Sequence, residues 1–131
     1  MVGIQDLNQL MKSIKPKLVN REFIFCSVSD KQFLSIKQKP LMMFREDEGM
    51  TLILNKKDAD LDSIKYKDVW VLITLTVHSD LTAVGFLARI TDALAKEGIS
   101  VNAVSAYYHD HLFILKEKSE QAIEILKRLS S

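Results

Sequence analysis

The sequence is poor in the residues that build disulfide frameworks, metal clusters and membrane spans. It has one cysteine, Cys26, in 131 residues, which excludes an internal disulfide framework and a zinc cluster held by several cysteines. Its longest uncharged apolar stretch, residues 69–77, is far shorter than the roughly 20 residues of a membrane span. The segment Met1–Asp6 has neither the basic region nor the apolar core of a secretory signal. We therefore expect a soluble, cytoplasmic, reduced protein.

Neither sign of charge is in excess. Lys and Arg number 18 and Asp and Glu number 17, so the formal net charge is +1. This balance offers no electrostatic reason to expect nucleic acid or an anionic membrane as the main partner. The apolar fraction of 47% and the charged fraction of 27% are those of a globular chain. The length suits one ordinary domain or two small halves that share a core.

Motifs of the common enzyme classes are missing as well. The chain has no glycine-rich phosphate loop, no serine nucleophile elbow, no metalloprotease helix motif and no dinucleotide-binding fingerprint. Cys26 lies among β-forming aromatic residues, which is typical of a small buried hydrophobe rather than a nucleophile. Because no pair of nucleophile and base can be assembled, we expect a protein that is not an enzyme and needs no cofactor.

The first half of the chain has the weaker secondary-structure signals. The expected elements are a helix over residues 4–14 that ends before Pro16, strands over 21–28, 41–44 and 50–54, and a short polar helix from a cap at Asn55 to about Ile64. Residues 29–31 are expected to form a turn, and no helix is evident over residues 32–39. This half therefore reads as a degenerate version of the second half.

The second half has a clear β-α-β-β-α order. The expected elements are a strand over 69–77, a helix capped by Asp80 or Thr82 with Val84, Leu87, Ile90 and Leu94 on its core face, strands over 99–107 and 111–116 joined by a two-residue turn at His109-Asp110, and a last helix capped by Ser119. This order fits a ferredoxin-like sheet with both helices on one face. One of the usual strands is missing at the end of the chain.

A weak internal repeat suggests how the missing strand is supplied. Residues 52–58 match residues 113–119 at an offset of 61, and each segment is a second hairpin strand that runs into a helix. We therefore expect an α+β protein with two tandem ferredoxin-like halves, antiparallel sheets and helices on one face. The expected domains are residues 1–66 and residues 67–131. A strand can cross between them.

The most useful polar residues lie where the strand over 69–77 leads into the next helix. Ser79 and Asp80 follow the strand, and Val84, Gly85 and Phe86 begin the helix. The free N–H groups of a first helical turn suit an α-carboxylate, and Asp80 suits an α-ammonium or a basic side chain. Gly85 would let a ligand approach the backbone. Alternatively, Asp80 and Thr82 are only caps, and Gly85 only eases packing.

The start of the next strand offers a second set of candidates, Ser100, Val101 and Asn102. In a β-α-β crossover this strand begins at the opposite end of the sheet. A pocket that uses both sets must therefore be completed by a neighbouring half or subunit.

The segment Tyr107–His111 raises the question of a metal site. His109 and His111 are two residues apart, and His78 could approach them from a neighbouring strand. No further ligand is evident, however. The favoured interpretation is that Asp110 and the histidines cap a turn while the tyrosines pack on the sheet. We therefore expect no metal.

Several of these stretches resemble ACT domains. The similarity is carried by Val77-His78-Ser79, Ala83-Val84-Gly85, Leu94-Ala95 and Gly98-Ile99-Ser100. The segments 44–52 and 102–113 are similar to those of a bacterial family of small tandem-ACT proteins. The chain also resembles one half of the CASTOR proteins, the animal arginine sensors. The resemblance covers residues 4–129.

The resemblance implies βαββαβ units that pair through sheets or helices and bind amino acids at the interface. In ACT sites the ligand meets the loop and helix start after the first strand, which here match Ser79, Asp80, Val84, Gly85 and Phe86. In the CASTOR sensors it also meets the start of the second strand, which here matches Ser100 and Val101. Those sensors are twice as long, so this chain would need a homodimer to build a comparable pocket.

The leading hypothesis is therefore a small-molecule-binding regulatory protein whose ligand is an amino acid and which acts as a homodimer. The protein that it regulates is not indicated by the sequence. The alternatives are an interaction module that docks a partner without any ligand and a metal-responsive regulator that uses His78, His109 and His111.

Overall fold

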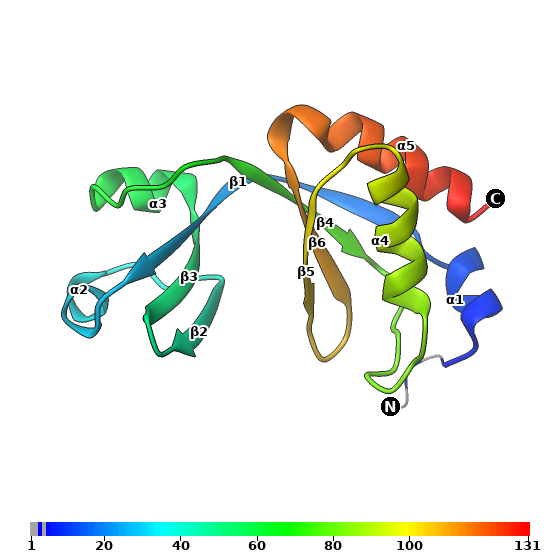
Figure 1. Ribbon diagram of the computed structural model, residues 1–131, viewed down its shortest axis with the longest axis horizontal. Helices are drawn as coiled ribbons and strands as arrows, with labels where there is room; N and C mark the ends of the chain where they lie inside the picture. Colours follow the sequence, from blue (N-terminus) through cyan, green and yellow to red (C-terminus); the bar gives the residue numbers. More distant parts are fainter. Residues whose placement is uncertain (1–2, 4) are drawn as a thin grey trace. The chain divides into compact units, whose positions relative to one another are not determined.

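Strand β1, Pro16–Val28, is the element that the two compact parts of the chain share. The computed structural model describes residue 3 and residues 5–131 (Figure 1). The larger unit comprises the chain up to Asn20 together with Val71–Ser131, and the smaller unit comprises Arg21–Trp70. The compact units thus divide the chain differently from the expected domains 1–66 and 67–131. The reason is that β1 carries the chain from the larger unit into the smaller one.

The larger unit has the strand order β1-β4-β6-β5. Its elements are α1 (Leu7–Lys12), the first part of β1, β4 (Trp70–Leu75), α4 (Phe86–Lys96), β5 (Val101–Ser105), β6 (Asp110–Leu115), the 3₁₀ turn η1 (Lys116–Lys118) and α5 (Ser119–Leu129). The strand that the second half of the sequence lacks is therefore supplied by β1, from the front of the chain. The prediction that this strand crosses the boundary is confirmed.

The core of the larger unit lies between this sheet and its helices. Alternate residues of β4, Val71, Ile73 and Leu75, are buried in it because successive side chains of a strand point to opposite faces. Helices α4 and α5 are both amphipathic and bury one stripe each in the same cluster: Phe86, Ile90 and Leu94 from α4, and Ala122, Ile125 and Leu126 from α5. The expected ferredoxin-like sheet with both helices on one face is confirmed.

The smaller unit has the strand order β2-β3-β1. Its elements are the second part of β1, α2 (Asp30–Ser35), β2 (Met42–Glu46), β3 (Gly49–Asn55) and α3 (Lys56–Leu61). Both strand pairs are antiparallel. Leu52 of β3 lies opposite Cys26 of β1 on one side and opposite Met43 of β2 on the other. Its core is a separate cluster made by Ile24, Val28, Met50, Leu52, Leu54 and Ala59. This unit follows the same β-α-β-β-α order as the larger one.

Several local predictions were wrong. Residues 29–31 begin helix α2 rather than form a turn, because Ser29 and Gln32 make a capping box in which each side chain binds the other's backbone N–H. Asn55 makes no side-chain cap. Ser119 is the first residue of α5 and likewise makes no cap. The β5–β6 connection is the four residues 106–109 rather than His109-Asp110, because Asp110 pairs with Ser105 in the strand register.

The first helix is shorter than expected, since α1 covers Leu7–Lys12. Ile4 lies outside the described residues. Asp6 caps this helix by accepting a hydrogen bond from the Gln9 N–H at 3.0 Å. Within the described part of the chain, no helix combines the length and apolarity that crossing a membrane requires.

Candidate functional site

The connection between β4 and α4, residues 76–85, contributes Ser79, Asp80, Leu81 and Ala83 to one wall of a cavity in the larger unit. The cavity measures about 200 Å³ and is lined by Ser79, Asp80, Leu81, Ala83, Phe86, Leu87, Ser105, Ala106 and Asp110. Three of the residues that the sequence singled out, Ser79, Asp80 and Phe86, thus lie together at one hollow. The end of β5 and the start of β6 complete it.

Asp110 is the buried polar centre of this site, with 7% of its surface exposed. Its Oδ2 accepts a hydrogen bond from the Ser79 hydroxyl at 2.9 Å, and its Oδ1 accepts one from the Ser105 hydroxyl at 2.6 Å. The carboxylate therefore joins the loop after β4 to the hairpin end of β5 and β6. A buried carboxylate with a donor on each oxygen is the arrangement that makes burial of a charge tolerable.

The sequence interpretation missed Ser105 and treated Asp110 only as a turn residue. A signal was available, because in a β-α-β crossover the two parallel strands end at the same edge of the sheet. The polar residue that ends β5 therefore had to lie near Ser79, which follows β4.

Asp80 is held in a tight turn rather than at a helix cap. Its Oδ1 accepts hydrogen bonds from the Thr82 backbone N–H at 2.8 Å and from the Thr82 hydroxyl at 2.5 Å. These hydrogen bonds lower the pKa of Asp80, and the bond from the Thr82 hydroxyl has the largest effect. The side chain is therefore a carboxylate at neutral pH. The Gln5 side chain donates to the Thr82 hydroxyl at 3.0 Å and ties the front of the chain to this turn.

The predicted helix caps at Asp80 and Thr82 were wrong, because α4 begins at Phe86. Gly85 is the cap residue and has a φ of +88°, in the left-handed region that favours glycine. Because glycine has no side chain to act as a cap, the N–H groups of Phe86 and Leu87 in the first turn receive no hydrogen bond from a capping side chain. Val84 is 83% exposed and does not line the cavity.

The second set of predicted residues lies elsewhere in this unit. Ser100 precedes β5, while Val101 and Asn102 begin it, and Val101 pairs with Ile114. Ser105, which lines the cavity, pairs with Asp110 at the other end of the same hairpin. Four residues of strand separate the two ends by about 13 Å. The larger unit therefore does not bring Ser100, Val101 and Asn102 to the cavity that contains Ser79 and Asp80.

A smaller hollow of about 160 Å³ lies beside the same turn. It is lined by Gly3, His78, Asp80, Leu81 and Tyr107. The Tyr108 ring lies 5.4 Å from the His78 ring and 5.1 Å from the Tyr107 ring, measured between centroids. The two tyrosines thus contact His78 and each other from the β5–β6 connection, with 66% and 58% of their surface exposed, so they do not pack on the sheet as expected.

The histidines do not gather as metal ligands would. The rings of His109 and His111 are 6.2 Å apart and nearly perpendicular. Among the residues that the structure describes, no group of three or more His, Cys, Asp or Glu side chains is placed to hold a metal ion. The alternative of a metal-responsive regulator therefore gains no support from the described geometry.

Acidification is expected to destabilise the larger unit through His111. Burial lowers the pKa of His111, whose Nδ1 lies 3.0 Å from the Thr74 hydroxyl. The unfolded chain takes up this proton near pH 6.5 and the folded chain only at lower pH, so stability is lost as the pH falls below about 6.5. His111→Gln should therefore show a smaller drop in melting temperature between about pH 7.5 and about pH 5.5. Equal drops in both proteins would contradict this role.

Comparison with known protein families identifies the family to which the chain belongs. A model described as an ACT domain matches residues 2–71, and a second model with the same description matches residues 66–128. The first match alone covers more than half of the chain. The protein therefore belongs to the ACT-domain family and contains two tandem ACT domains, as the sequence resemblance implied. No specific similarity to the CASTOR sensors is shown.

Solved structures agree with this assignment. A Vibrio cholerae protein of unknown function, described as a possible transport protein, is 39% identical over 95% of this chain and 96% of that chain, with a TM-score of 0.84. The ligand-free regulatory subunit of aspartate kinase from Thermus thermophilus is 10% identical over 92% of this chain and all of that chain, with a TM-score of 0.68. At this identity the second likeness shows the fold alone. No curated protein matches this chain.

Proposed function

We propose that this tandem ACT protein is a regulatory protein that binds an amino acid at the cavity of the larger unit. The observation that carries the proposal is the composition of that cavity. Two carboxylates, Asp80 and Asp110, line it without any Lys or Arg, which suits a ligand ammonium group. Both oxygens of Asp110 already accept serine hydroxyls, so Asp80 is the carboxylate that meets the ligand.

The start of α4 supports the other end of an amino acid. Phe86 and Leu87 line the cavity, and the first turn to which they belong has no side-chain cap. Backbone N–H groups of this kind, at the positive end of the helix dipole, suit an α-carboxylate. The volume of about 200 Å³ lies below the ~300–1,000 Å³ of pockets for drug-sized ligands and favours a small one.

The proposal includes a homodimer, because the predicted site residues fall into two groups. Ser79, Asp80, Val84, Gly85 and Phe86 lie around the loop after β4. Ser100, Val101 and Asn102 are at the far end of β5 and would reach a ligand only from a second copy of the chain. Light scattering should give a mass twice the 14.9 kDa of one chain. A monomer that still binds ligand fully would remove the dimer from the proposal.

Replacing Asp80 with asparagine is expected to weaken amino-acid binding at least about tenfold, because a hydrogen bond to a charged group is worth roughly 1.5–3 kcal/mol. Calorimetric titration with each of the twenty standard amino acids measures this effect. Asp92→Asn is the matched control, since Asp92 is exposed on α4, pairs with Lys96 and does not line the cavity. Gly85 is a poor site for this test because any side chain there strains the left-handed backbone. No binding by the wild type, or equal binding by Asp80→Asn, would overturn the proposal.

A specific observation supports the interaction module as the alternative function. Four large apolar side chains in the loop after β4 and in the β5–β6 connection are exposed by more than half of their surface: Leu81, Val84, Tyr107 and Tyr108. Clustered exposed apolar residues mark docking surfaces. In this case Val84→Ser and Tyr107→Ser would abolish capture of a partner, whereas Asp80→Asn would leave it unchanged.

A further inference from the structure

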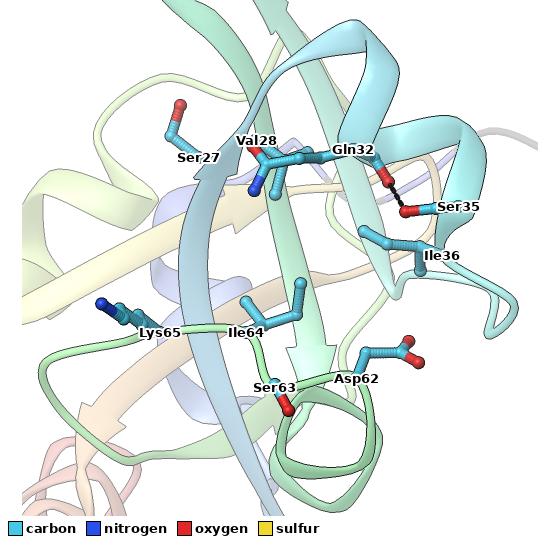
Figure 2. A pocket seen from close by; sticks show the side chains of 9 residues that line it. All are labelled: Ser27, Val28, Gln32, Ser35, Ile36, Asp62, Ser63, Ile64 and Lys65. Atoms are coloured by element: carbon cyan, nitrogen blue, oxygen red, sulfur yellow. Dashed lines mark hydrogen bonds between the residues drawn. The ribbon is translucent and has the colours of Figure 1, made fainter.

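The smaller unit contains a cavity of its own, of about 430 Å³. Figure 2 shows it between the end of β1, helix α2 and the loop that follows α3. It shares no residue with the cavity of the larger unit. Its volume lies within the ~300–1,000 Å³ of small-molecule sites.

The length of the helices explains why this cavity exists. In the larger unit, α4 and α5 have eleven residues each, pack against each other and bury their apolar stripes in one core. The corresponding helices of the smaller unit, α2 and α3, have six residues each. At 1.5 Å per residue they are about 9 Å long instead of about 17 Å. The space that longer helices would fill is left open between α2 and the loop after α3.

The cavity has an apolar floor. Val28 is buried in the core cluster of the smaller unit, and Ile36 and Ile64 pack against that cluster while still lining the cavity. Ile64 lies in the middle of Figure 2, with the other labelled side chains around it. A ligand that lies here therefore covers apolar surface that the protein leaves open to water.

The rim of the cavity is polar. Ser27, Asp62, Ser63 and Lys65 line the cavity, and within the described part of the chain their side chains make no hydrogen bond or ion pair. Asp62 and Lys65 carry opposite charges. In Figure 2 they lie on opposite sides of Ile64. A ligand that pairs with both must therefore carry its own two charges apart, with an apolar part between them.

The loop that carries these residues is fixed in place. The Ile64 N–H donates to the Ala59 carbonyl at 2.8 Å. Just beyond the loop, the Tyr66 hydroxyl donates to Asp60 Oδ1 at 2.6 Å, and the Lys56 ammonium donates to Asp60 Oδ2 at 2.9 Å. These bonds lower the pKa of Asp60, so the bonded carboxylate persists at neutral pH. Binding would therefore not require the loop to become ordered first.

We propose that this cavity is a second ligand site, for a small zwitterion whose ammonium and carboxylate are separated by an apolar chain. The ammonium pairs with Asp62, the carboxylate pairs with Lys65, and the apolar chain covers Ile64 and Ile36. Such a ligand differs from an α-amino acid, in which both charged groups are attached to one carbon atom. The site is independent of the one proposed in the larger unit.

Two isomeric probes test the proposal. 6-Aminohexanoate and L-leucine have the same atoms, but only the first has its charged groups at the ends of an apolar chain. Titration followed by amide chemical shifts in NMR should show 6-aminohexanoate moving the signals of Ser27, Gln32 and residues 63–65. Leucine should leave these signals unmoved. Shifts confined to residues 79–87 would support only the larger unit's site and would overturn the second site.

Matched variants complete the test. Asp62→Asn and Lys65→Met should each weaken binding of 6-aminohexanoate by about fivefold, the size expected for a partly exposed charge pair. Asp68→Asn and Lys67→Met are the controls, because both residues are exposed, follow the same loop and do not line the cavity. The amide spectrum without ligand reports whether each variant is folded. Equal affinities for 6-aminohexanoate in the variants and in the controls would overturn the charge pairing. Amide shifts with leucine as large as those with 6-aminohexanoate would overturn the proposed class of ligand.

Discussion

Replacing Leu94 with alanine is expected to lower the free energy of unfolding by about 2–5 kcal/mol. Leu94 is 0% exposed and lies on the core face of α4, in the cluster that the helices share with β4. The substitution removes apolar surface from this cluster and leaves a cavity that the neighbouring strands and helices cannot fully close. A small protein has only about 5–15 kcal/mol of stability in total, so the effect is large.

Urea denaturation at neutral pH measures this loss. Leu61→Ala is the matched control, because Leu61 is also a helical leucine but is 77% exposed. The same chemical change there should alter the free energy of unfolding by less than about 0.5 kcal/mol. If the two variants lost similar amounts, Leu94 would not occupy the core position that we assign to it.

Replacing Asp110 with alanine is expected to cost about 2–3 kcal/mol. The substitution breaks the hydrogen bonds from Ser79 and Ser105, and each of these bonds involves a charged group. The Ser79 hydroxyl suffers most, because Ser79 is buried and would be left without its acceptor. The larger unit should become less stable as a whole, since this carboxylate joins the loop after β4 to the β5–β6 hairpin.

A double-mutant cycle separates the hydrogen bonds from other effects of the change. Asp110→Ala combined with Ser79→Ala should cost less than the sum of the two single changes. In the double variant the Ser79 hydroxyl is absent, so removing Asp110 no longer leaves that donor without an acceptor. Asp92→Ala serves as the control, since its exposed i,i+4 pair with Lys96 is worth about 0.3–0.5 kcal/mol. Strict additivity of Asp110→Ala and Ser79→Ala would contradict the coupling.

The candidate site was only half predictable, for reasons that particular residues make clear. Ser79, Asp80 and Phe86 were found because a strand followed by a helix start is visible in the local pattern. Ser105 was missed although the β-α-β crossover places the end of β5 at the same edge of the sheet as Ser79, and Asp110 was missed because its pairing with Ser105 across β5 and β6 brings it there. Local propensity also misplaced the start of α4, which depends on the left-handed backbone at Gly85.

The smaller unit shows the same limit. Residues 29–40 have no clear helical periodicity, yet a capping box at Ser29 and Gln32 starts a helix there. The six-residue length of α2 and α3 could not be judged from the pattern, and the cavity beside Ile64 follows from it. Short elements carry too few apolar residues for a reliable period, so tertiary packing decides their limits.

The sequence by itself determined the class of fold, because alternation in β4 and helical spacing in α4 and α5 depend only on which side of each element is apolar. It also determined that two similar units exist, through the repeat of a hairpin strand that leads into a helix. Only the tertiary structure decided that β1 is the strand that crosses into the larger unit, which polar side chains meet Asp110, and where cavities remain. These features depend on contacts between residues that are far apart in the chain, and no local pattern records such contacts.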